Sequence, residues 1–480
     1  MLLAASCGSE EGEGAARPAP NVWVNAKDKV QPLSRNHEAP AVLIDRDEPN
    51  TVYLAESEMI SGECRFYVST DRGASWQPEE APKLEPFTRN CAMGYASSQN
   101  IRTELQQGRD GTIYLVFQAN DPGRNGTRSV LLGRSKDGGR SWQTVAIDPG
   151  KPAPEPGIDM EANFEGHLAL DSENPRRVYA IWRRSFNNRF RTDNPPTRPY
   201  MSISDDAGAT WSTPFVPFEK NIGFDGPRPI AVDGRLWAFY REAAPSAQPD
   251  QPPPLTRLFA GVSGDQGKTW EHNEITAAAD ASEVYPLYDR DKKLFHVVWH
   301  DNRAAELDAY YSRSTDGKTW TQPKRLNDDP TGMRMGQHYP QISQAPNGRI
   351  DVAWYDWRDD PFPPPTPPTS GSPPTSALLG LFSNRGKVAS VYMTSSQDDG
   401  RSWTRNVRVN DVPIDRTIGS WINNKDVMAP VAISSGDRGP IIAWSDTRNG
   451  NGLNDTQDIF TSTVTFGDPA DRQVTPLQAG

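Results

Sequence analysis

The chain has 480 residues, 35% of them apolar, and carries a formal net charge of −11 at pH 7. This acidic balance argues against a nucleic-acid partner and against binding to an anionic membrane surface, because both require a basic surface. No apolar stretch in the sequence approaches the roughly 18 residues of a membrane-spanning helix. The 38 glycines, 44 prolines and 14 tryptophans are typical of many short strands joined by turns.

The first residues place small side chains before Cys7 and a polar segment after it, in the run Met1-Leu-Leu-Ala-Ala-Ser-Cys7-Gly-Ser-Glu-Glu. This pattern resembles a bacterial lipoprotein signal without its basic start, so we expect a truncated signal and tether over residues 1–19. A lipid on Cys7 would anchor the protein to a membrane without spanning it. The alternative is a leader with an incidental cysteine. We therefore expect a secreted or cell-surface protein whose one membrane contact is the lipid.

Residues 21–25, Asn-Val-Trp-Val-Asn, resemble residues 406–410, Asn-Val-Arg-Val-Asn, which we expect to be the fourth strand of a repeated unit. The last unit of the chain has a third strand at 458–466 but no fourth strand after it. We therefore expect residues 20–26 to complete that unit and close a ring, which removes exposed strand edges. Residues 468–480 are expected to be a solvated tail.

Between these ends the chain contains seven pairs of short segments with β-branched residues and alternating polarity, which suit sheet strands. The first members begin near Glu38, Arg102, Glu165, Arg228, Val284, His338 and Met428. The second members begin near Val52, Ile113, Val178, Leu236, Phe295, Ile350 and Ile441. Seven such units predict an all-β fold, a seven-bladed β-propeller over residues 20–467.

Six of the units contain nearly the same octapeptide. After its first serine, Asp follows two residues later, Gly four residues later, Ser or Thr six residues later and Trp seven residues later. The copies begin at Ser69, Ser135, Ser204, Ser263, Ser314 and Ser396, and the copy at Ser314 is one residue short. The Asp and Ser/Thr side chains can bond to nearby backbone N–H groups, while the glycine can adopt a positive φ. The closing Trp suits packing between sheets. The pattern predicts a repeated turn whose aspartates are structural and neither catalytic nor metal-binding.

Two cysteines, Cys64 and Cys91, flank the first octapeptide. In an oxidising compartment they could form a disulfide, and two free buried thiols are the alternative.

The connections between strands divide into a short set and a long set. The first-to-second turns and the octapeptides are short, and in a propeller they share one face. The long connections are residues 184–199, 241–255, 356–390 and 446–457, with the links 77–100, 143–163 and 404–426. We expect function on this long-loop face, because functional loops gather on rigid scaffolds. The proline-rich segment 361–375 within it is predicted to be a stiff or disordered flap.

The octapeptide S-x-D-x-G-x-[ST]-W resembles the Asp-box, or BNR, repeat of sialidases and related β-propellers, and its copies extend over roughly residues 60 to 410. In that family the box is a structural turn far from the active site. The resemblance implies three arginines that clamp a carboxylate, a Tyr nucleophile with a Glu base, and an Asp acid/base. Where the family has its first arginine, this chain has Glu38-Ala-Pro40. Where the family has its Asp acid/base, this chain has Glu56 and Glu58. Sialidases usually have six blades, whereas this sequence predicts seven.

Several polar residues near the strand ends are candidates for a site. Glu283 and Tyr285 lie two apart on an inner strand and share one face, which suits a base and a nucleophile. A Tyr packed between blades beside a solvated Glu is the alternative. Asp301 and Glu38 are further candidate catalytic carboxylates. The candidate substrate-binding residues are Arg184, Arg228, Arg241, His338 and Tyr339. For the three arginines, charged pairs between blades are the alternative.

The motif Trp-x-Asp-x-Arg begins at Trp299, Trp354 and Trp444. Its recurrence in consecutive units favours a structural Asp–Arg ion pair, because a catalytic residue is usually unique.

The sequence offers two candidate metal sites. His37, His167 and His338 fall near the starts of three inner strands and could bind a metal together with Glu38 and Glu165, but they belong to distant units, so a shared ion is not expected. The oxygen-rich loop 449–458 could hold calcium, although it lacks the spacing of an EF-hand and a turn-rich loop is the alternative. We expect no other cofactor.

Together these patterns favour a monomeric extracellular propeller that binds a glycan or a surface protein through its long-loop face. The alternative is a glycoside hydrolase, exo-sialidase-like or other, acting on extracellular glycans. A hydrolase would need two carboxyl groups about 5–10 Å apart across the mouth of the channel.

Overall fold

The computed structural model describes residues 16–27, 37–58, 62–85, 89–90, 104–121, 127–150, 160–187, 197–222, 226–242, 255–279, 281–282, 284–304, 306–331, 336–361, 388–418, 430–450 and 456–466. These ranges consist mainly of β-strands and turns, with one short 3-10 helix at Val24–Lys27. Over the same ranges, no helix has the length and apolar character needed to cross a membrane.

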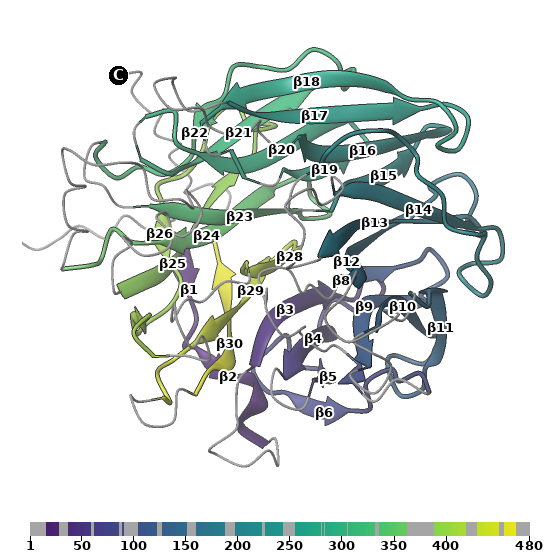
Figure 1. Cartoon of the computed structure of the whole chain (residues 1–480). Helices are drawn as coiled ribbons and strands as arrows, with labels where there is room; N and C mark the ends of the chain where they lie inside the picture. Colours follow the sequence, from purple (N-terminus) through teal and green to yellow (C-terminus); the bar gives the residue numbers. More distant parts are fainter. Residues whose placement is uncertain are drawn as a thin grey trace, which may run out of the picture.

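Seven antiparallel sheets surround a central axis and form a seven-bladed β-propeller, as the sequence predicts (Figure 1). Blade 1 contains β3 (His37–Ile44), β4 (Val52–Glu58), β5 (Glu63–Ser69) and β6 (Gln77–Glu79). Blade 2 contains β8 (Glu104–Gln107), β9 (Ile113–Asp121), β10 (Thr127–Ser135) and β11 (Gln143–Asp148), with β7 (Arg89–Asn90) beside β9. Blade 3 contains β12 (Met160–Leu170), β13 (Val178–Asn187) and β14 (Arg198–Ser204).

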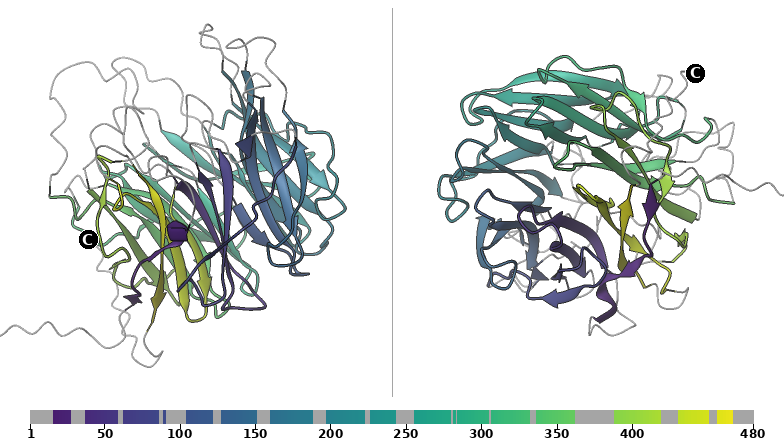
Figure 2. Two further views of the ribbon diagram at one scale, coloured as in Figure 1. Left: turned by 90° about the horizontal axis from the view of Figure 1, so that it is seen from below. Right: turned by 180° about the vertical axis from the view of Figure 1, so that it is seen from behind.

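The remaining four blades continue round the ring (Figure 2). Blade 4 contains β15 (Arg228–Val232), β16 (Arg235–Glu242), β17 (Thr256–Ser263) and β18 (Glu271–Ala278). Blade 5 contains β19 (Tyr285–Asp289), β20 (Leu294–Asp301), β21 (Asp308–Ser314) and β22 (Lys324–Arg325). Blade 6 contains β23 (Gln337–Gln344), β24 (Ile350–Asp356), β25 (Val388–Ser396), β26 (Val407–Arg408) and β27 (Ile414–Asp415). Blade 7 contains β28 (Ala432–Gly436), β29 (Gly439–Asp446) and β30 (Asp458–Thr465).

The N-terminal segment closes the ring, which confirms the expectation from the sequence. Strand β2 (Val22–Trp23) pairs antiparallel with β30, with Val22 opposite Thr461 and Trp23 opposite Phe460. The rings of Trp23 and Phe460 stack with their centroids 6.3 Å apart. Purple and yellow strands therefore lie side by side in Figure 1. Strand β1 (Arg17–Pro18), from the segment expected to be a tether, extends this pairing along β30.

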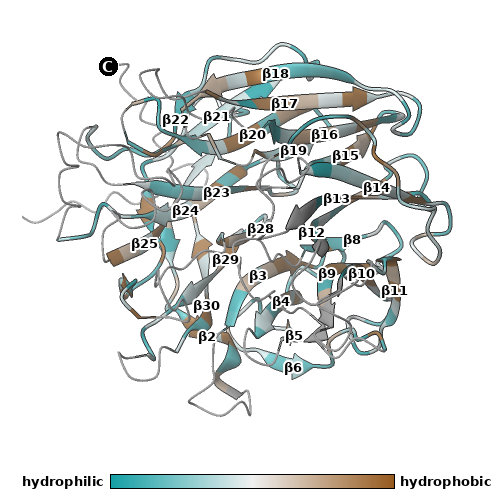
Figure 3. Cartoon of the chain, in the orientation of Figure 1, coloured by the Kyte–Doolittle hydropathy of each residue, from teal (hydrophilic) through white to brown (hydrophobic). Residues whose placement is uncertain are grey.

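The apolar core lies between neighbouring blades. Each of the seven clusters of buried apolar residues that the described ranges contain draws its members from two adjacent blades. Apolar residues are accordingly spread over strands all round the ring (Figure 3). In one cluster Trp354 of blade 6 packs with Val298 and Tyr311 of blade 5, and Trp403 of an octapeptide meets the Tyr311 ring edge-on at 5.0 Å. Because this burial holds the blades together, the axis of the ring can carry polar side chains.

The octapeptides form the predicted turn. In the first copy Ser69 Oγ donates to Asp71 Oδ1 (2.8 Å) and accepts from the Gly73 amide (2.7 Å). The Asp71 carboxylate also accepts from the amide (2.8 Å) and hydroxyl (2.6 Å) of Ser75. Gly73 has φ +85°. The serine–aspartate and serine–glycine bonds recur in the other five copies, so these aspartates are engaged within their own turns.

The octapeptides share a face with the first-to-second turns. Arg72 of the first octapeptide donates through Nη2 to the Gly439 carbonyl (2.6 Å) in the turn of blade 7. The long connections that the sequence predicts for the opposite face lie largely outside the described residues, as do Cys7, the proline-rich segment after Pro361 and the tail from residue 467. Cys64 is buried and disulfide-bonded, and its expected partner Cys91 also lies outside the described residues.

Candidate functional site

The inner strands of the seven blades line the axis of the propeller, and neighbouring inner strands contact one another round the ring. They enclose two cavities of about 340 and 180 Å³. Five side chains line both cavities and therefore lie between them. They are Glu104, His167, Arg228, Tyr285 and Ile342, which come from β8, β12, β15, β19 and β23 of five consecutive blades.

One position of the inner strand supplies a complete layer of this channel. The residues of this channel layer are Ala41, Glu104, His167, Arg228, Tyr285, Gln341 and Ala432, one from each blade. They are paired with Ala55, Val116, Ile181, Phe239, Val298, Ala353 and Ala443, which occupy the same position of the second strands. All seven line the smaller cavity. Blades 2 to 6 thus present five different polar side chains, and blades 7 and 1 present two alanines.

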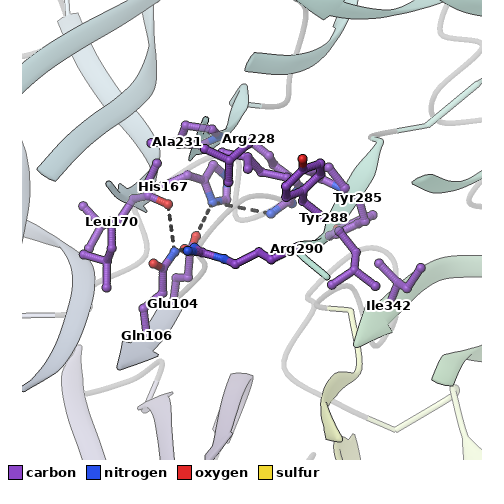
Figure 4. Close-up of a pocket in the computed structure, with 17 residues that line it drawn as sticks. Glu104, Gln106, His167, Leu170, Arg228, Ala231, Tyr285, Tyr288, Arg290 and Ile342 are labelled. Carbon is purple, nitrogen blue, oxygen red and sulfur yellow. Dashed lines mark hydrogen bonds and ion pairs between the residues drawn. The ribbon is translucent and has the colours of Figure 1, made fainter. Parts of the chain in front are cut away.

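Four polar residues of the channel layer, those from blades 2 to 5, contact one another in blade order (Figure 4). The Glu104 carboxylate lies 2.7 Å from His167 Nδ1. His167 Nδ1 is also 3.4 Å from Arg228 Nη1. The Arg228 guanidinium carbon lies 3.9 Å from the centroid of the Tyr285 ring. Gln106 contacts Glu104 and donates to the Leu168 carbonyl (2.8 Å), which fixes the carboxylate from behind.

Opposite charges in the layer keep Glu104 ionised. Burial alone would raise the pKa of Glu104, but the hydrogen bond and positive charge of His167, assisted by Gln106 and Arg228, hold it below its usual value. Glu104 is the one carboxylate among the described residues that line the two cavities. The layer therefore offers one carboxylate acceptor facing a guanidinium and an imidazole.

The larger cavity continues from the layer towards the face of the short turns. Its wall there is apolar, formed by Leu170, Val232 and Ile342. Tyr288 lines it as well, and its hydroxyl donates to Asp233 Oδ2 (2.9 Å). Arg290 stands at this end of the cavity (Figure 4). The channel thus combines a polar band with apolar walls, as small-molecule sites commonly do.

Three inner strands carry a bulge just before the channel layer. The pairing register shifts at Ala39 in β3, at Glu165 in β12 and at Tyr339 in β23. These residues have φ values of +53°, +49° and +54°, in the left-handed region that side chains rarely adopt. Such bulges re-aim the side chains that follow and are frequent next to functional sites.

Of the residues singled out by the sequence, Arg228 and Tyr285 are brought together in the channel layer. Glu283 lies outside the described residues. Glu38 is 2% exposed in β3 and does not line either cavity.

Asp301 is fully buried and engaged within its own blade. Its carboxylate accepts from Trp299 Nε1 (2.6 Å) and from Nε of Arg303 (2.9 Å). Asp356 and Asp446 make the same contacts with the Trp and Arg of their motifs. The structural ion pair predicted from the recurrence of Trp-x-Asp-x-Arg is thus confirmed in all three copies.

The other candidate arginines lie between blades. Arg184 is ion-paired with Asp148, donates through Nε to Asn163 Oδ1 (2.9 Å), and lies 3.7 Å from the centroid of the Tyr200 ring. Arg241 donates through Nη1 to the Ala281 carbonyl (3.3 Å). Neither lines the two cavities.

His338 and Tyr339 belong to a separate cluster between blades 5 and 6. His338 is 1% exposed and packs against Trp357, with ring centroids 4.3 Å apart, and against His300 at 5.1 Å. The Tyr339 amide donates to His300 Nδ1 (3.1 Å). These contacts hold the bulge of β23 against its neighbour.

Metal ligands do not gather within the described ranges, where no group of three or more His, Cys, Asp or Glu side chains could hold an ion. Residues 451–455 of the oxygen-rich loop lie outside those ranges.

Sequence reasoning passed over Glu104 and treated His167 solely as a metal ligand. The signal that could have found them is the alignment of the seven inner strands, because the two residues occupy the same column as Arg228 and Tyr285.

No protein-family model matches the chain, and no curated protein matches it either. Solved structures are similar in fold. An α-L-arabinofuranosidase of Fusarium graminearum in complex with an iminosugar inhibitor is 13% identical, with 70% of this chain and 92% of that chain covered and a TM-score of 0.45. A Hadza microbial sialidase is 12% identical, with 86% and 76% covered and a TM-score of 0.46. An α-L-arabinanase of Penicillium chrysogenum complexed with arabinobiose is 13% identical, with 94% and 98% covered and a TM-score of 0.43.

Proposed function

We propose that the protein is an extracellular propeller that binds a glycan, and that a sugar unit of the glycan occupies the central channel at the channel layer. The observation that carries the proposal is that layer itself, in which one strand position presents Glu, His, Arg, Tyr and Gln from consecutive blades to a shared cavity. A position with a purely structural role would be expected to carry similar residues in similar blades.

The chemistry of the layer suits a sugar. Sugar hydroxyl groups need hydrogen-bond acceptors and donors, which Glu104 and Arg228 supply on the polar side of the cavity. The C–H faces of a sugar need apolar contacts, which Pro40, Ala41 and Ala432 supply on the opposite side. Small-molecule sites combine these two kinds of wall.

The size of the channel favours a sugar over a protein as the occupant of this site. A cavity of about 340 Å³ is near the lower end of the roughly 300–1,000 Å³ range of small-molecule sites. The idea of a surface protein on the long-loop face stays a prediction, since most of those loops lie outside the described residues.

The proposal is tested by filling the channel without removing its polar groups. Ala432→Leu places a larger apolar side chain in the smaller cavity, whereas Ala74→Leu makes the same change in an exposed turn. On a printed array of neutral and acidic glycans, we expect wild type and Ala74→Leu to show the same ligands and Ala432→Leu to lose them. Equal glycan binding by all three proteins would contradict a channel site.

A glycoside hydrolase is the second candidate, and one observation favours it. Tyr285, the candidate nucleophile of the sequence, lines both cavities beside Arg228. Fluorogenic glycosides that include sialosides separate the two functions. Turnover that disappears in Tyr285→Phe would establish the hydrolase, and the absence of turnover with glycan binding intact would favour the binding protein.

We further propose that the chain is a monomeric member of the Asp-box, sialidase-like superfamily and is held at the cell surface by a lipid on Cys7. The six octapeptides support the family and the residues around Cys7 support the lipid anchor, while the monomeric state stays a prediction. Cys7→Ser should release the protein from the membrane fraction of expressing cells into the soluble fraction. An unchanged distribution would contradict the lipid anchor.

A further inference from the structure

A second group of charged side chains lies where β10 of blade 2 meets β12 and β13 of blade 3, away from the two cavities. The guanidinium carbons of Arg128 and Arg183 lie 4.4 and 4.2 Å from the centroid of the same ring, that of Phe164. Both arginines are nearly buried, with 8% and 4% of their surface exposed. Two positive charges therefore share one small and largely dehydrated region.

The carboxylates near Arg128 belong to Glu165 and Asp148, and both interact with residues other than Arg128. Glu165 Oε2 lies 3.6 Å from Arg183 Nε and accepts from the Gly226 amide at 2.6 Å. The nearby Asp148 is paired with Arg184. Within the part of the chain that the structure describes, Arg128 has no acidic partner, and its Nε is buried without a hydrogen-bond acceptor.

A buried cation without a counter-ion is unfavourable, and the ring of Phe164 offsets only part of that cost. Burial, together with the charge of Arg183, lowers the pKa of Arg128 to about 10. Arg128 is therefore still cationic at neutral pH and retains its attraction for an anion.

We propose that Arg128, assisted by Arg183, forms a binding site for an oxyanion of the carboxylate or sulfate type. The forked donors of a guanidinium match such groups, and the low exposure strengthens each bond. The anion has two possible sources, a small ion from solution or an acidic substituent of a glycan. Phe164 and His167 both belong to β12, with the bulge at Glu165 between them, so an extended glycan could contact both sites. The anion site itself does not rest on the proposed glycan function.

The test measures the melting temperature of the full chain as sodium sulfate replaces sodium chloride at constant ionic strength. Three variants accompany the wild type. Arg128→Gln removes the charge, Arg128→Lys keeps the charge but removes the fork, and Arg140→Gln makes the same charge change in an exposed turn of the same blade. We expect a saturable rise with sulfate in wild type and Arg140→Gln, half-saturation at about tenfold higher sulfate in Arg128→Lys, and no rise in Arg128→Gln.

The melting temperature without sulfate separates this role from a structural one. Removing an unpaired buried charge should leave Arg128→Gln as stable as wild type or more stable. A purely structural arginine would instead give a less stable variant and no sulfate response in the wild type. A sulfate response that is the same in Arg128→Gln and wild type would overturn the proposal.

The source of the anion is distinguished with methyl β-D-glucuronide and its neutral counterpart methyl β-D-glucoside. An acidic substituent predicts that the glucuronide stabilises the protein, that the glucoside does so less, and that both Arg128→Gln and Ala432→Leu reduce the difference. A small ion predicts that sulfate alone stabilises it and that Ala432→Leu has no influence. If Ala432→Leu keeps all glycan binding, the proposed glycan site in the channel is wrong, whereas the proposed anion site is unaffected.

Discussion

Blades 5 to 7 and blades 1 to 4 differ at the end of their second strands. In blades 5, 6 and 7 that position is Asp301, Asp356 and Asp446, each bonded to a Trp two residues before it and an Arg two residues after it. In blades 1 to 4 the corresponding residues are Glu58, Ala119, Arg184 and Glu242. The first group repeats one contact. The second group shares no contact, since Arg184 pairs with Asp148, Glu242 pairs with Lys220, and Ala119 has an apolar side chain.

The comparison separates side chains that hold a blade together from side chains that face the central channel. A contact that recurs at one structural position is explained by the fold, because blades 5, 6 and 7 end their second strands with the same ion pair. The channel layer is the opposite case, since its polar members differ in every blade from 2 to 6. Variation at an equivalent position, combined with a shared cavity, is therefore the mark of a candidate site.

The largest effect is expected from breaking a recurrent ion pair. Asp301→Ala leaves Trp299 Nε1 and the Arg303 guanidinium without their carboxylate, so we expect a loss of roughly 3–5 kcal/mol in the free energy of unfolding. Urea unfolding measures it, with Asp291→Ala in an exposed turn as the control. Glycan binding should be retained at temperatures where the variant is folded. A stable variant that loses binding would make Asp301 a site residue after all.

A smaller loss is expected from the octapeptide glycines. Gly139 has φ +86°, and a Cβ there would lie 2.2 Å from the Phe66 ring of blade 1, so Gly139→Ala should destabilise by about 2–4 kcal/mol. Gly111→Ala is the matched control, because Gly111 has φ +79° but its Cβ would meet nothing closer than 4.0 Å. It should lose about 1–2 kcal/mol from backbone strain alone. Equal losses in urea unfolding would show that the turn does not pack against its neighbour.

The channel layer should respond in the opposite way, with a change in affinity and little change in stability. Arg228→Gln removes the guanidinium that lies beside His167 and over Tyr285, so affinity for a glycan found on the array should fall by about 1–3 kcal/mol. Arg235→Gln makes the same charge change at an exposed position of β16 and serves as the control. Titration calorimetry measures both. An affinity that stays at the wild-type value in Arg228→Gln would exclude this residue from the site.

The smallest effect is a pH dependence of the recurrent turns. The Ser141 hydroxyl and amide that donate to Asp137 hold its pKa at about 2, below the ordinary 3.8, and Asp206, Asp265 and Asp316 behave alike. Because the folded pKa values are lowered, the stabilisation is complete above pH 4 and is lost as the pH falls towards 2. The melting temperature should fall over that interval, and less steeply in Asp265→Asn. Asp291→Asn, in an exposed turn outside the octapeptides, is the control, and identical slopes in the two variants would contradict the assignment.

The repeated turns and the number of blades could be predicted because their causes are local or periodic. Ser69, Asp71 and Gly73 lie within five residues of one another, so the turn follows from the chemistry of a short peptide. Closure by Val22 and Trp23 could be predicted as well, because a ring with one incomplete blade leaves an edge that needs a partner.

The candidate site could be predicted only in part. Arg228 and Tyr285 were identified by their side-chain chemistry, whereas Glu104 was missed and His167 was considered as a metal ligand alone. Arg184 was predicted to bind substrate like Arg228, but it is ion-paired with Asp148 of another blade. A local sequence pattern does not indicate such a partner. Whether an arginine faces a carboxylate or a cavity depends on contacts between blades.

The sequence by itself determined the repeat, the turn in each repeat and the strand that completes the circle, since each depends on neighbours in the chain or on a regular period. Only the tertiary structure decided which polar residues meet. The seven members of the channel layer are separated by dozens of residues, and they come together because inter-blade packing brings every inner strand to the axis at one height. The type of each side chain is given by the sequence, but the distance between side chains of different blades depends on how the blades pack.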